Sequence, residues 1–158
     1  MDNPVQRFLD LFTGSKGAHG QTDVINRQRN GKQQAKYEIV RAPLTVGLVQ
    51  EHLDGKLGVG SIPIDETNKC LFGALDIDDY NLDLPVLFAK VKRFKLPLVL
   101  CRSKSGGAHL YLFLSEKVAA SEVRDRLAEF ASILGWAIVR CSPSRKSCWR
   151  NAVMWETL

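Results

Sequence analysis

Residues 97–114 read PLVLCRSKSGGAHLYLFL, and this stretch constrains the fold more strongly than any other in the chain. Leu98–Arg102 and His109–Leu114 are apolar segments, and the glycine-bearing segment between them predicts a β-hairpin. Two glycines allow a tight loop whose backbone N–H groups can hold phosphate oxygens. Arginine, lysine, serine and histidine side chains suit the same purpose. The candidate nucleotide-binding residues are therefore Arg102, Ser103, Lys104, Ser105, Gly106, Gly107 and His109.

Strand alternation places His109, Tyr111 and Phe113 on one face of the second strand. The residue types predict that the hairpin holds a triphosphate, with His109 donating to a phosphate. The alternative is a basic, solvated hairpin tip at which the histidine only packs.

A pair of carboxylates ends the segment LFGALDIDDY. A strand has a period of two residues, so Asp76 and Asp78 share one face and lie roughly 6–7 Å apart at the backbone. That spacing allows both to bind one divalent ion or a pair of ions, and Mg²⁺ and Mn²⁺ prefer such oxygen ligands. The alternative is an acidic turn after a buried strand, formed with the help of Asp79 and Asn81. Taken together with the hairpin, the pair predicts a metal-dependent nucleotidyl transferase.

The remaining periodicity predicts an α+β domain, a sheet with helices that forms a palm-like platform. Helices are expected from Asn3–Pro4 to Phe12, from Thr45 to Leu53, from Pro85 to Lys95, and from Ala119 to Leu134 with Ser121 as its cap. Further strands are expected over 36–41, 57–64 and 71–78. The polar and basic segment 22–34 shows little periodicity and predicts a loop.

Composition narrows the class of protein. At 158 residues with 45% hydrophobic and 25% charged side chains, the chain predicts one soluble globular domain. Its N-terminus lacks the apolar core of a secretory signal, and no membrane partner is expected, so we expect a cytoplasmic protein. Four cysteines without a C-x-x-C pair argue against structural zinc. The net charge of +5 does not establish nucleic-acid binding, because residues 1–136 hold 18 of the basic and 16 of the acidic side chains.

The segments ALDIDD and RSKSGGAHLYLFL resemble the first two motifs of the archaeo-eukaryotic primase superfamily, specifically the primase-polymerase domain of TOTE conflict systems and related phage proteins. The resemblance covers roughly residues 6–136. It implies an RRM-like palm with a mixed or antiparallel sheet and flanking helices. It also implies template-dependent primer synthesis or extension from nucleoside triphosphates on single-stranded DNA or RNA, with Mg²⁺ or Mn²⁺, alongside helicase or nuclease modules. Asp76 and Asp78 would bind metal, and Ser105 and His109 would contact the nucleotide phosphates.

The C-terminal segment departs from that family. The family has a third motif with an acid, in a context like E-x-F-P-K-Q, whereas this chain reads AIVRCSPSRKSCWRNAVMWETL. Allowed codons for the tail that begins at residue 138, read in a shifted frame, can spell CEMFPKQEELLAERGDVGN. We therefore expect residues 1–136 to form the catalytic domain, with an N-terminal extension over 1–35 and a palm over 36–136 that is C-terminally incomplete. Residues 137–158 are expected to be an out-of-frame tail, which sequencing the gene across codons 130–158 tests.

Two other functions fit parts of the sequence. A non-catalytic RRM-like module could bind single strands by stacking bases on Tyr111 and Phe113. It would need no metal. A metal-dependent phosphodiesterase would degrade nucleic acid without nucleoside triphosphates, but no second histidine lies near the acids to favour it.

Overall fold

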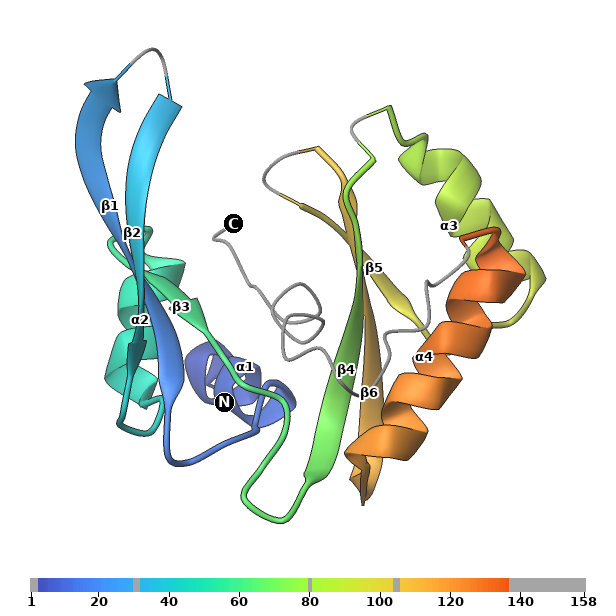
Figure 1. Cartoon of the computed structure of the whole chain (residues 1–158), viewed down its shortest axis with the longest axis horizontal. Helices are drawn as coiled ribbons and strands as arrows, with labels where there is room; N and C mark the ends of the chain where they lie inside the picture. Colours follow the sequence, from blue (N-terminus) through green and yellow to red (C-terminus); the bar gives the residue numbers. More distant parts are fainter. Residues whose placement is uncertain (1–2, 30–31, 80, 104–105, 137–158) are drawn as a thin grey trace, which may run out of the picture.

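The computed structural model describes residues 3–29, 32–79, 81–103 and 106–136, with only the backbone described over 23–29 and 32–36 (Figure 1). These residues form four helices and two antiparallel sheets, which confirms the predicted α+β class. The strand orders are β2-β1-β3 in the first sheet and β4-β6-β5 in the second.

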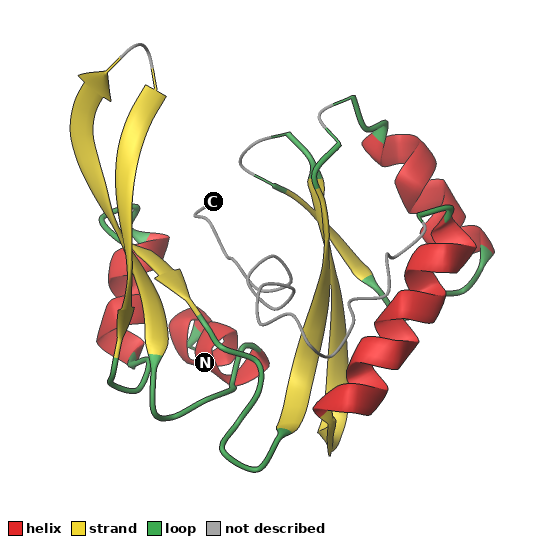
Figure 2. Cartoon of the chain, in the orientation of Figure 1, coloured by secondary structure: helices red, strands yellow, loops and turns green. Residues whose placement is uncertain are grey.

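The first sheet is built around one long hairpin. β1 (His19–Arg29) pairs with β2 (Lys32–Val40) along its length, and its residues Gly20 to Thr22 also pair with β3 (Gly58–Gly60). Helices α1 (Pro4–Leu11) and α2 (Val46–Leu53) belong to this half of the chain and contact each other. Beyond β3, the hairpin continues as a two-stranded ribbon (Figure 2).

Side-chain caps fix the starts of both helices, as the sequence predicts. The Asn3 carboxamide oxygen accepts a hydrogen bond from the Val5 N–H at 3.0 Å, and the Thr45 hydroxyl accepts one from the Leu48 N–H at 3.3 Å. Each cap satisfies an N–H that has no partner within the helix.

The second sheet has helices on one face. β4 (Lys69–Ile77) and β5 (Val99–Arg102) flank the central strand β6 (Ala108–Ala119). Helices α3 (Leu84–Arg93) and α4 (Ala120–Leu134) cover the face that points away from the first sheet (Figure 1). The opposite face of the sheet points toward the first half of the chain (Figure 1). Polar residues lie at one end of this face.

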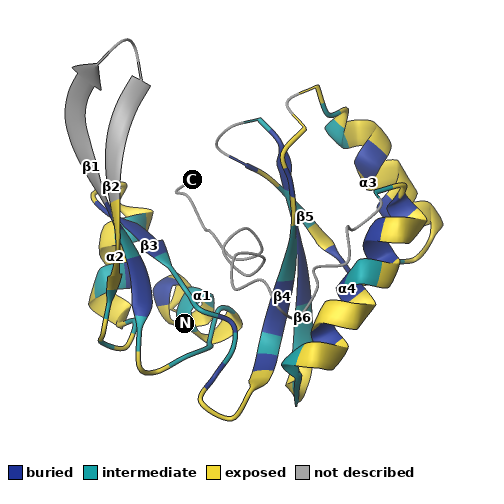
Figure 3. Ribbon diagram, in the orientation of Figure 1, coloured by how far each residue is buried: buried dark blue, intermediate teal, exposed yellow. Residues whose placement is uncertain are grey.

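The main hydrophobic core lies between this sheet and its two helices (Figure 3). Alternate residues of β4 and β6 point into it, and the helical spacing of α4 supplies the facing side. Among its members are Ile77, Leu87, Val91, Leu110, Leu112, Val123, Leu127, Phe130 and Leu134. Burial of each large apolar side chain contributes about 1.5–3 kcal/mol, so the helices are held firmly on this face.

A buried carboxylate organises the turn that leads into β4. Asp65 is 8% exposed and accepts hydrogen bonds from the N–H groups of Thr67 and Lys69. Its second oxygen lies 2.6 Å from the Lys117 ammonium on β6. The hydrogen bond from Lys117, followed by that from Thr67, holds the pKa of this carboxyl well below its ordinary value.

Three predictions about secondary structure are wrong. Within the segment 22–34, predicted as a loop, residues 22–29 belong to β1 and residues 32–34 to β2, because a ribbon outside the core needs no apolar alternation. The strand predicted over 57–64 is limited to Gly58–Gly60. Ser121 does not cap α4, whose N-cap is Ala119 without a side-chain bond.

The predicted boundary between the N-terminal extension, residues 1–35, and the palm, residues 36–136, falls within β2. The predicted tail, residues 137–158, lies outside the described residues. Within the parts of the chain that the structure describes, no helix has the length and apolarity needed to cross a bilayer.

Candidate active site

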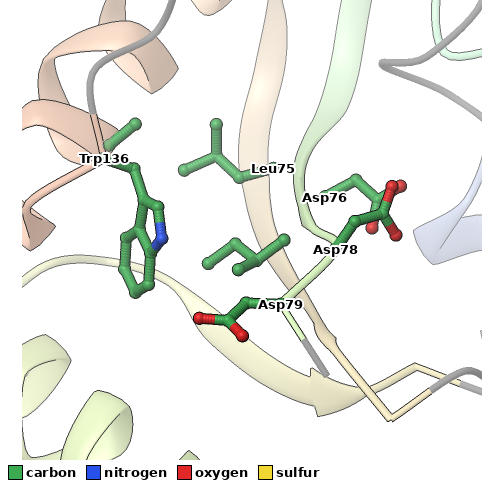
Figure 4. Close-up of a pocket in the computed structure, with 7 residues that line it drawn as sticks. Leu75, Asp76, Asp78, Asp79 and Trp136 are labelled. Carbon is green, nitrogen blue, oxygen red and sulfur yellow. The ribbon is translucent and has the colours of Figure 1, made fainter. Parts of the chain in front are cut away.

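The two predicted metal-binding carboxylates lie at the end of β4. Asp76 is the penultimate residue of the strand, and Asp78 follows its last residue, Ile77. Figure 4 shows both carboxylates on the same side of the chain, whereas the Asp79 side chain points the other way, toward Trp136. The strand alternation predicted from the sequence thus holds past the last paired residue.

The predicted histidine lies directly opposite the first of these acids. Asp76 and His109 are register partners in the antiparallel pair of β4 and β6. The His109 Nε2 atom lies 3.3 Å from an Asp76 carboxylate oxygen. Their side chains are 15% and 27% exposed, so both are partly accessible to solvent. The structure therefore brings together an acid and a histidine that are 33 positions apart in the sequence.

The second nitrogen of the same ring contacts a buried tyrosine. The Tyr111 hydroxyl lies 3.0 Å from His109 Nδ1, and only 5% of Tyr111 is exposed. Burial, aided by the nearby Cys101 and Asp76, raises the pKa of the Tyr111 phenol well above its ordinary value. The phenol therefore stays protonated in the neutral range and can donate its proton to the imidazole.

Gly107 lies close against the end of β4. The Ser103 N–H donates to the Gly107 carbonyl at 3.0 Å, and the Gly106 N–H donates to the Ser103 carbonyl at 3.1 Å. Gly106 has a φ of +99°, and a Cβ on Gly107 would collide with the Ile77 carbonyl oxygen. Two of the N–H groups expected to bind phosphate are thus used inside the loop, whose tight path places His109 beside Asp76.

The other predicted nucleotide-binding residues are distributed differently. Arg102 is exposed, and its register partner is Ala108, so alternation places it on the face opposite to His109. Lys104 and Ser105 lie outside the described residues. Cys101, which no sequence motif marks as a candidate, is the register partner of His109 on β5 and so shares its face.

A pocket of about 380 Å³ adjoins the end of β4. It is lined by residues of the segment 75–79, by Ala131 of α4 and by Trp136 (Figure 4). The Asp79 carboxylate accepts a hydrogen bond from the Asn81 N–H at 3.0 Å, a contact that fits the acidic turn of the alternative interpretation. Trp136 lies just past the last predicted helix, where no periodicity could have indicated a role in this pocket.

These features define a class of domain. An antiparallel sheet carries two helices on one face, and on the other face an acidic strand end meets a histidine, as in a palm-type α+β domain. A family model described as the TOTE conflict system, Archaeo-Eukaryotic Primase domain, matches residues 5–134. The chain therefore belongs to this family, which confirms the resemblance predicted from its motifs. No curated protein matches the chain.

Proposed function

We propose that this chain is the catalytic palm of a cytoplasmic primase-polymerase. It would make or extend primers from nucleoside triphosphates on a single-stranded DNA or RNA template, alongside helicase or nuclease modules. The observation that carries the proposal is the direct pairing of Asp76 with His109, at 3.3 Å, on the strand end that also bears Asp78. Membership of the primase family supports the same chemistry.

The residues present fit a divalent cation such as Mg²⁺ or Mn²⁺. In the described part of the chain no group of three or more His, Cys, Asp or Glu residues could hold a metal. Mg²⁺ is commonly bound through only one or two carboxylates together with substrate phosphates and water. Asp76 and Asp78 supply that number of carboxylates on one side of the chain (Figure 4). When bound, the cation would neutralise the charge that develops on the phosphates during nucleotidyl transfer.

The remaining groups would orient the nucleotide. His109 Nε2 faces Asp76 at the partly exposed end of the sheet, and when a triphosphate binds, its proton can be donated to a phosphate oxygen in place of that carboxylate. The close approach of Gly107 to the Ile77 carbonyl keeps the start of β6 against β4, so the histidine and the acids stay within reach of one triphosphate. The apolar core behind the sheet gives this arrangement a rigid support.

The described residues do not favour the single-strand-binding module. That alternative depends on Tyr111 and Phe113 as an open stacking surface. Tyr111 is 5% exposed, and both rings pack edge-on against Phe12, with centroid distances of 5.6 and 5.4 Å. The two aromatic side chains therefore serve the packing of α1 on the sheet.

The experiment is a gel assay of primer synthesis and extension with Mg²⁺ or Mn²⁺, on the 158-residue chain and, beside it, on the protein read in the shifted frame. Asp76→Ala should lower incorporation by about 100-fold or more, because several kcal/mol of charge stabilisation depends on the metal. Asp125→Ala removes an exposed carboxylate on α4 and should leave incorporation unchanged.

Metal-independent strand binding without incorporation by either protein would contradict the proposed activity and favour a binding module. Normal incorporation by a folded Asp76→Ala protein would remove the argument for a metal site at this strand end.

A further inference from the structure

We infer that Tyr111 is a positioning residue, whose phenol holds the His109 ring so that the Nε2 proton faces the Asp76 carboxylate. One part of the inference, the use of that proton in nucleotide binding, rests on the proposed function. The hydrogen-bonded arrangement itself can be tested in the absence of any activity.

The geometry places three groups in a row. Tyr111 and His109 are two residues apart on β6, so both point from the same face of the strand. The phenol oxygen lies 3.0 Å from Nδ1, and Nε2 on the other side of the ring lies 3.3 Å from Asp76. The imidazole is thus held from both of its nitrogens.

The donor and acceptor capacity of each group decides which atom donates in each of the two hydrogen bonds. An ionised carboxylate can only accept, so the nitrogen that faces Asp76 is the one that carries the proton. In a neutral imidazole, Nδ1 is then an acceptor, and it accepts from the protonated phenol. The phenol therefore favours the single tautomer that directs a proton to the acidic strand end.

The phenol itself is kept in place by packing. The Tyr111 ring meets the Phe12 ring edge-on, with 5.6 Å between centroids and an interplanar angle of 79°. Phe12 also meets Phe72 of β4 at 5.3 Å in the same edge-on manner. Phe12 follows the last residue of α1, so the end of this helix braces the tyrosine whose hydroxyl orients the histidine.

Removing the hydroxyl while keeping the ring separates these roles. In Tyr111→Phe, the packing against Phe12 remains, but Nδ1 loses this donor and the imidazole can rotate or change tautomer. Partners that orient metal-ligating side chains commonly contribute a factor of 10 to 100 to metal affinity or activity, and we take the lower end for this histidine. We therefore expect triphosphate affinity to fall on the order of 10-fold in this variant. Tyr37→Phe is the matched control, because Tyr37 is an exposed tyrosine on β2.

The first readout is the ¹⁵N NMR spectrum of the His109 ring in the full chain, recorded at a pH where the imidazole is neutral. The wild-type spectrum and that of Tyr37→Phe should show a protonated Nε2 and a hydrogen-bonded Nδ1. In Tyr111→Phe the Nδ1 resonance should move. Unchanged ring resonances in a folded Tyr111→Phe protein would overturn the inference.

The second readout is binding of ATP and dATP in the presence of Mn²⁺. Weaker binding by Tyr111→Phe than by wild type and Tyr37→Phe supports the positioning role, and equal binding by all three contradicts it. If the wild-type protein itself binds neither nucleotide, the proposed function fails. The NMR result then still decides whether Tyr111 sets the histidine ring.

Discussion

Gly107 shows how one residue without a side chain can decide the shape of the site. Gly107 directly precedes β6, and at this position the carbonyl oxygen of Ile77 on β4 occupies the space that a Cβ would need. The neighbouring Ser103 and Gly106 close the loop through backbone hydrogen bonds. Any larger residue at position 107 must push the two strand ends apart, and Asp76 and His109 lie on those ends.

Gly107→Ala should therefore destabilise the domain by about 1–3 kcal/mol, the usual effect of adding a group to a filled space. Urea unfolding followed by circular dichroism measures the change. Gly47→Ala is the control, because a Cβ there meets only Thr45 Oγ1 at 3.9 Å. In helix α2 that substitution should be neutral or stabilising by up to about 1 kcal/mol. Equal stability of the two variants would show that the strand ends give way at little cost.

At the scale of an element, the turn that leads into β4 is held by a carboxylate whose effect depends on pH. The folded-state pKa of Asp65 is lowered by Lys117, by Thr67 and by backbone N–H groups. A carboxyl with a lowered folded pKa stabilises the fold above its unfolded pKa, which is about 3.9. As the pH falls below that value, the unfolded chain takes up the proton first, and the stabilisation is progressively lost.

Asp65→Asn removes this dependence. The difference in melting temperature between wild type and the variant should be largest near neutral pH and should shrink as the pH is lowered from 5 to 2. Thermal melts across that range measure it. Asp125→Asn, at an exposed position of α4, should show a small difference that does not change in this way. A gap between wild type and Asp65→Asn that stays constant down to pH 2 would contradict the role given to Lys117.

Sequence patterns could predict the helices and strands that bury one of their faces in the core. The helical spacing of Val123, Leu127, Phe130 and Leu134 and the alternation in β6 follow directly from the core that they build. Of the β1–β2 hairpin only the strand over 36–41 was predicted, because the two-stranded ribbon beyond β3 has no core face to impose alternation. Its register is set by pairing across the whole hairpin, which no local window reports.

At the scale of the whole molecule, the candidate site depends on contacts that are remote in sequence. The Asp76–His109 pair follows from the antiparallel register of β4 and β6. The two motifs predicted that these side chains belong to one site, but they did not predict that the two residues lie directly opposite each other. The contribution of Phe12 could not be predicted, because it comes from a helix of the first half of the chain that packs on the sheet of the second. The Ser61 hydroxyl fixes that junction by donating to the Phe12 carbonyl at 2.6 Å.

The position of β6 has a consequence for how the protein opens in solution. Its residues Ala108 to Tyr111 are paired with β4 on one side and with β5 on the other, and three of the four are almost fully buried. Amide protons there should exchange with deuterium only when the domain unfolds globally, whereas those of the β1–β2 ribbon beyond β3 should exchange through local fraying. The histidine thus stands on a strand that we expect to be strongly protected from exchange. A substitution on β6 that abolishes the proposed nucleotidyl transfer but leaves the amide exchange of this strand unchanged would show that the lost activity is not a result of unfolding.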